Sequence, residues 1–130
     1  MEHKLKLHLL DEKFALSKMP QFAEVPSVMT KGELCFVART DEELSIFCPE
    51  FMAPTNVQQV AGYRCFRIAD GTSTDEIGVI VSLVKPLADA KISIFSVSTF
   101  STTYIFLMEE DLVKATQALQ QAGHEFIHED

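Results

Sequence analysis

The chain has 130 residues, 47% of them hydrophobic and 23% charged, which suits one compact domain or two small units that share a core. Its net charge of −8 argues against nucleic acid and membrane surfaces as partners, because an acidic protein repels phosphate groups. The N-terminal sequence MEHKLKLHLL alternates charge with leucine and has no continuous apolar segment. It therefore predicts a strand and not a signal peptide.

The first half of the sequence is typical of short β-strands. They are predicted at residues 4–10, 13–17, 33–39 and 44–48. Pro20, Pro26 and Gly32 lie between the second and third of these strands and predict a loop with at most one short helical turn. Thr40 and Glu43 have the spacing of a capping box, so a single helical turn is predicted between the last two strands.

The second half has a more regular pattern. A strand is predicted at residues 63–69, and a helix follows whose apolar residues recur at helical spacing: Ile77, Ile80, Val81, Val84, Leu87 and Ala88. Ser73 and Glu76 form a capping box just before that helix, and Pro86 predicts a bend in it and not its end.

Two further strands, a second helix and a last strand complete the predicted fold. They are expected at residues 92–98, 103–109, 109–122 and 124–128, in that order. Three acids open the second helix and suit its positive N-terminal dipole, while Gly123 is expected just after its end. The order βαββαβ predicts an α+β fold in which two helices pack on one face of an antiparallel sheet.

Two stretches carry a resemblance to a known family. The sequences GVIVSLVKPLADAKISIFSVSTFSTTYIFL and FVARTDEELSIFCPE resemble the ACT domain, in the bacterial ACT-like family related to the cytosolic arginine sensors of the TOR kinase pathway. The positions that match the pattern are Gly78, Pro86, Leu87, Ser93, Ser98, Thr99, Tyr104 and Leu107.

The resemblance implies two ACT-like subdomains and an aspartokinase-like regulatory module. Residues 1–60 would form a degenerate β-rich half and residues 61–130 a ferredoxin-like βαββαβ ACT domain. It also implies a small ligand, typically an amino acid, in a pocket that a second copy completes, so we expect a homodimer. The ligand-binding residues that it implies are Thr74, Asp75, Ile77, Gly78, Val79, Ser93 and Ile94.

The residues themselves leave two interpretations of the helix start open. Unpaired N–H groups at a helix N-terminus suit a carboxylate, and Gly78 inside the first turn would let a ligand approach the backbone. Alternatively, Gly78 only packs against the adjacent strand, and Ser73 caps the helix internally. Asp75 could hold an ammonium group.

Hydroxyl groups recur between residues 91 and 107. Ser93 lies on a strand face with bulky apolar residues and is a candidate ligand contact, whereas Ser96 and Ser98 are expected to meet solvent or cross-strand partners. Where relatives often carry an acid, this sequence has Ser101, Thr102 and Thr103. A neutral or small polar amino acid is therefore expected to bind better than arginine.

No catalytic apparatus is visible in the sequence, and we expect no enzyme, no cofactor and no metal site. Three scattered cysteines predict reduced thiols of a cytoplasmic protein, with Cys48 and Cys65 inert in apolar strands. His124 and His128 share a strand face but lack a third ligand. The alternative to a sensor is a ligand-free module that dimerises or docks on an enzyme.

Overall fold

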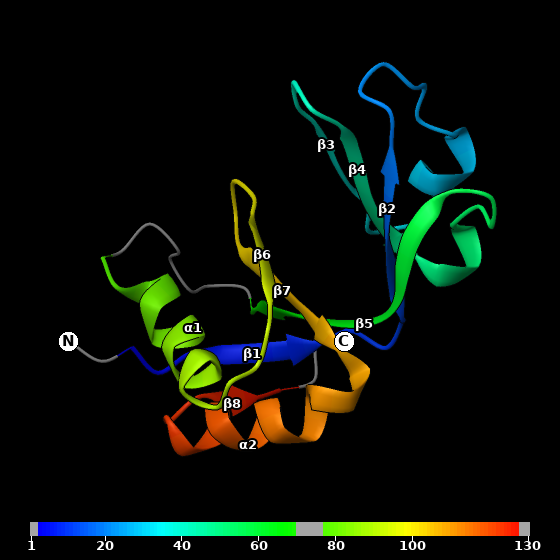
Figure 1. Cartoon of the computed structure of the whole chain (residues 1–130). Coiled ribbons are helices and arrows are strands. Elements are labelled where there is room, and N and C mark those ends of the chain that lie inside the picture. Colours follow the sequence, from blue (N-terminus) through cyan, green and yellow to red (C-terminus); the bar gives the residue numbers. More distant parts are fainter. Residues whose placement is uncertain (1–2, 70–76, 128–130) are drawn as a thin grey trace. The chain divides into compact units, whose positions relative to one another are not determined.

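The computed structural model describes residues 3–69 and 77–127 and has the expected α+β class (Figure 1). The chain divides into two compact units, and we describe each by itself. The helical unit contains Met1–Asp11 and Arg64–Asp130, and the strand unit contains Glu12–Tyr63. The ranges 1–60 and 61–130 expected for the two ACT-like subdomains stay a prediction.

The helical unit contains the predicted βαββαβ order, preceded by a strand from the N-terminal segment (Figure 1). Its elements are β1 (Lys6–Leu9), the second half of β5 (Gln58–Ile68), α1 (Val79–Asp89), β6 (Phe95–Ser98), β7 (Thr103–Met108), η3 (Glu109–Asp111), α2 (Leu112–Gln121) and β8 (Glu125–Phe126). The strand order in this unit is β6-β7-β5-β1-β8.

Strand β1 occupies a central place that the sequence pattern does not predict. It pairs antiparallel with β5, and on its other side it pairs in parallel with β8. The N–H of Glu125 donates to the carbonyl oxygen of Leu5 at 2.9 Å, and that of Ile127 to Leu7 at 2.8 Å. A wholly antiparallel sheet was expected, but the pair formed by β1 and β8 is parallel.

The core of the helical unit lies between the sheet and both helices. Leu7 on β1, Phe66 on β5 and Leu107 on β7 are buried against Leu83 of α1 and Leu119 of α2. Burial of such side chains is the main stabilising contribution, about 1.5–3 kcal/mol for each. Neither helix, nor any other helix in the part of the chain that is described, is long and apolar enough to cross a membrane.

The strand unit is a small antiparallel arrangement with its own core. It contains β2 (Phe14–Met19), η1 (Ser27–Thr30), β3 (Phe36–Arg39), β4 (Leu44–Pro49), η2 (Glu50–Met52) and the first half of β5. Strand β2 pairs with β4 and β5, and β3 pairs with β4. The core consists of Met19, Met29, Leu44, Ile46 and Cys48. Helix η1 confirms the single short turn expected in the loop before β3.

The helical turn predicted from Thr40 and Glu43 is wrong, because these residues close a β-hairpin. The N–H of Thr40 donates to the carbonyl oxygen of Glu43 at 2.9 Å, which continues the antiparallel ladder between β3 and β4. The hydroxyl oxygen of Thr40 accepts the N–H groups of Glu42 and Glu43. A threonine three residues before a glutamate therefore caps a hairpin turn here.

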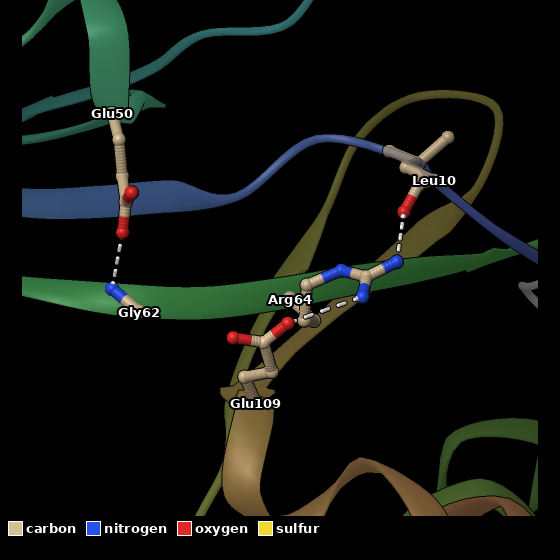
Figure 2. A network of polar contacts seen from close by, with 5 residues as sticks. All are labelled: Leu10, Glu50, Gly62, Arg64 and Glu109. Carbon is tan, nitrogen blue, oxygen red and sulfur yellow. Dashed lines mark hydrogen bonds and ion pairs between the residues drawn. The ribbon is translucent and has the colours of Figure 1, made fainter.

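Strand β5 begins five residues before the predicted start at residue 63 and contains a bulge. Gly62 has a φ of +90°, and its N–H donates to the carboxylate of Glu50 at 2.6 Å within the strand unit (Figure 2). In the helical unit, the guanidinium of Arg64 donates to the carbonyl oxygen of Leu10 at 3.0 Å and forms an ion pair of 3.7 Å with Glu109 (Figure 2). The contacts of Gly62 and Arg64 hold β5 to other segments of the same unit and are not part of the candidate ligand site.

Candidate ligand site

The start of α1 carries three of the expected ligand-binding residues. The side chain of Ile77 is 97% exposed, whereas Val79 is buried in the core of the helical unit. The carbonyl oxygen of Ile77 accepts a hydrogen bond from Nε2 of His3 at 2.9 Å. The N-cap residue of α1 is Gly78, which has no side chain to form a capping hydrogen bond.

Gly78 does not lie inside the first turn as expected, because the helix begins at Val79. Gly78 precedes it with a φ of +88°, a left-handed conformation that favours glycine. Among the residues at 3–69 and 77–127, a β-carbon built there would meet the His3 ring alone, at an ordinary contact distance of 3.7 Å. The glycine is therefore explained by its backbone conformation and not by close packing against a strand.

The other two expected residues, Ser93 and Ile94, lie beyond the opposite end of α1. Ser93 is exposed, and Ile94 packs against the core. An 11-residue helix is about 16 Å long, so α1 separates Gly78 from Ser93 within one chain. The structure thus does not bring the two groups together in a single copy. Thr74, Asp75 and the capping box of Ser73 and Glu76 lie outside the described residues.

Several hydroxyls in the β6–β7 hairpin have internal partners. The hydroxyl of Ser98 contacts that of Thr103 at 2.9 Å, which confirms the expected cross-strand partner. Thr102 donates to the carbonyl oxygen of Ile68 at 2.7 Å, and Thr99 donates to the carbonyl oxygen of Thr102. Ser93, Ser96 and Ser101 are exposed and could meet a ligand or a second chain.

A groove of about 610 Å³ between α1 and α2 was not anticipated from the sequence. Its lining includes His3, Gly78, Lys85, Asp89 and His124. Lys85 and Asp89 form an ion pair of 2.7 Å on the exposed face of α1. Small residues on α2 leave this space open, and only that pattern of alanines, Ala118 and Ala122, could have indicated it.

No cluster of three metal-ligating side chains occurs within residues 3–69 and 77–127. His124 is buried, and both of its ring nitrogens are engaged by backbone groups. The thiols of Cys48 and Cys65 are buried, and their burial raises the pKa of each.

Comparisons with known proteins concern the family and the fold of the chain. Residues 60–121 match the family model of the ACT domain. The chain is 30% identical to protein Atu0741 from Agobacterium tumefaciens, over 98% of this chain and 96% of that one, with a TM-score of 0.92. No curated protein matches the sequence.

The fold is also that of the regulatory subunit of one aspartate kinase and of part of another aspartate kinase. The regulatory subunit of aspartate kinase from Thermus thermophilus gives a TM-score of 0.61 at 11% identity, over 87% of this chain and 95% of that one. Aspartate kinase from Clostridium acetobutylicum gives 0.69 at 10% identity, over 94% of this chain and 35% of that one. At these identities the likeness concerns the fold alone.

Proposed function

Because the chain belongs to the family of the Agobacterium tumefaciens protein and matches the ACT domain over residues 60–121, we propose that it is a regulatory module that binds a small molecule, an amino acid. The likeness to the regulatory subunit of an aspartate kinase supports a regulatory and not a catalytic role. The relationship to the cytosolic arginine sensors and the cytoplasmic location belong to the same proposal.

The start of α1 is the part of the proposed site that binds the ligand's carboxylate. The N–H groups of its first turn carry a partial positive charge, and the N-cap Gly78 has no side chain over the backbone. Thr74, Asp75, Ile77 and Val79 complete this half of the site in the proposal. The single observation that carries it is the helix start at Val79 with a left-handed glycine, Gly78, as its N-cap residue.

The other half of the site comes from a second copy. Since α1 separates Gly78 from Ser93 in one chain, we propose that Ser93 and Ile94 of the partner copy complete the pocket in a homodimer. Strand β6 supports this arrangement, because it lies at the edge of the sheet in the helical unit and Phe95 on it is 47% exposed.

A melting-temperature screen of the free amino acids tests the proposal. A ligand that binds only the native state raises the melting temperature, by an amount that grows with its concentration. We expect a neutral or small polar amino acid to give the largest rise and arginine a smaller one. If no amino acid changes the melting temperature while light scattering shows a dimer, the chain is the ligand-free interaction module.

A further inference from the structure

The register of the β3–β4 hairpin places two cysteines opposite each other. Phe36 pairs with Phe47 and Val37 with Ile46, and extending this register by one residue beyond the start of β3 sets Cys35 opposite Cys48. The sequence alone gives the separation of the two cysteines along the chain, but not the hairpin register that sets them opposite each other.

The hydrogen-bond pattern fixes the kind of pair that these cysteines form. Thr40 and Glu43 are a hydrogen-bonded pair, and hydrogen-bonded and non-hydrogen-bonded pairs alternate along an antiparallel ladder. Counting back from Thr40 makes Cys35 and Cys48 a non-hydrogen-bonded pair. In such pairs the Cα atoms lie about 4.5 Å apart, within the range of about 4.4–6.8 Å that a disulfide spans.

The two side chains also point toward the same core. Cys48 is fully buried in the core of the strand unit, and Cys35 is a partly buried residue packed against that core. A charge on Cys35 contributes, after burial, to the raised pKa of Cys48, which is about 11. This direction agrees with the common place of the two cysteines in that core. Both cysteines are free thiols in this structure.

We propose that Cys35 and Cys48 are a site of reversible oxidation, at which a low-molecular-weight disulfide converts the two thiols into a cross-strand disulfide. Cys35 is the attacking residue, because it is the more exposed of the two. Cys48 is the resolving residue, because it is buried and lies beside Cys35.

The exchange proceeds in two balanced steps. The Cys35 thiolate attacks one sulfur of the small disulfide, so that a mixed disulfide forms and one small thiolate leaves. The Cys48 thiolate then attacks Sγ of Cys35 and displaces the second small thiolate. The two protons lost by the cysteines are taken up by the two released thiolates. The small disulfide is reduced to two thiols, and the protein is oxidised by two electrons.

Cys65 provides a natural control within the same chain. It is the one cysteine in the sequence of the helical unit, and it is fully buried there. Cleavage after lysine and arginine separates the three cysteines, because Cys35 falls in residues 32–39, Cys48 in 40–64 and Cys65 in 65–67. Each cysteine can therefore be assigned from its own peptide.

The test treats the folded full-length chain with oxidised glutathione at mildly alkaline pH, followed by mass spectrometry before and after digestion. We expect the loss of two hydrogen atoms, a cross-link between peptides 32–39 and 40–64, and full reversal by dithiothreitol. Cys65→Ala should form the same cross-link. Cys35→Ser should gain no glutathione, since Cys48 is buried, whereas Cys48→Ala should retain one glutathione on Cys35.

Four results would overturn the proposal. They are a stable glutathione adduct on Cys35 of the unmodified sequence, a cross-link that includes Cys65, no reaction at Cys35, and a cross-link that forms only in denaturant. Circular dichroism of the oxidised chain is the control for a cross-link that forms only in denaturant. A cross-strand disulfide formed in the folded protein leaves its spectrum unchanged.

Discussion

His124 donates from Nε2 to the carbonyl oxygen of Ser82 at 2.8 Å and so ties the end of α2 to α1. Its Nδ1 accepts the N–H of Leu5 at 3.0 Å. Because a backbone N–H can only donate, Nδ1 carries no proton and the ring is neutral, with its proton on Nε2. The side chain is only 4% exposed. His124 is therefore a structural link between three segments of the helical unit.

Replacing His124 by alanine should destabilise the protein strongly. The change leaves the N–H of Leu5 and the carbonyl oxygen of Ser82 without their partner, at about 1–3 kcal/mol for each buried group. Urea unfolding measures the loss. The matched control is His3→Ala, which removes one exposed bond to Ile77 and should cost about 1 kcal/mol or less. Equal losses in the two variants would contradict this role for His124.

Gly78→Ala should lower the free energy of unfolding by about 1–2 kcal/mol, because alanine is strained at a φ of +88°. Asparagine tolerates this conformation, so Gly78→Asn should cost less than Gly78→Ala. Gly32 gives the opposite order: its β-carbon would lie 3.0 Å from Sδ of Met52, so the larger asparagine should cost more there. Thermal unfolding of the four variants checks both orders.

Ser93→Ala should weaken binding of any amino acid found in the screen by about two- to tenfold, the effect of one lost hydrogen bond. Its melting temperature without ligand should not change, because Ser93 is exposed. Ser96→Ala, an exposed serine on β6, serves as the control and should bind normally. Calorimetry that gives equal affinities for all three proteins would remove Ser93 from the site.

Phe95→Asp should shift the proposed homodimer toward the monomer, since it introduces a charge on the exposed face of edge strand β6. Light scattering at tens of micromolar measures the mass, and circular dichroism checks that the fold is retained. Val113→Asp changes a still more exposed residue on α2, 71% against 47% for Phe95, and should leave the dimer intact. The proposed arrangement would be refuted by a monomer in the unchanged chain.

The free energy of unfolding should fall as the pH rises above about 9. Burial raises the pKa of Cys65, and burial together with the charge on Cys35 raises that of Cys48 to about 11. In the unfolded chain thiols titrate near about 8.5, so the unfolded state loses these protons first. The contribution is fully present below the unfolded pKa and is lost above it. In Cys65→Ala the free energy of unfolding, measured by urea titrations at increasing pH, should fall less steeply than in the unchanged chain. Parallel plots of this free energy against pH for the two proteins would contradict the assignment.

Alternation and helical spacing were enough to predict most elements of the fold, but not their partners. The leucines of β1 predict a strand, yet nothing in their pattern indicates that it lies between β5 and β8. The early start of β5 was missed because Gln58 and Gln59 are polar, and Gly62 resembles a loop residue until its N–H is seen to bond Glu50.

The candidate site could be predicted in part. Gly78 and Ser93 were identified by resemblance, and the helix that lies between them was predicted as well. The pairing of Cys35 with Cys48 was missed. It depends on the register of a hairpin whose turn, at Thr40 and Glu43, has the spacing of a helix cap.

The position of β1 has a consequence for how the protein is made. The N–H of Leu5 is bonded to a histidine 119 residues later, and β1 has β8 as one of its two neighbours. Contacts of such long range form late during folding. While the ribosome synthesises the intervening residues, Leu5 and Leu7 lack their contacts with β8 and His124 and stay exposed to other nascent chains. The helical unit can therefore complete its sheet only after residues 124–127 have left the ribosome.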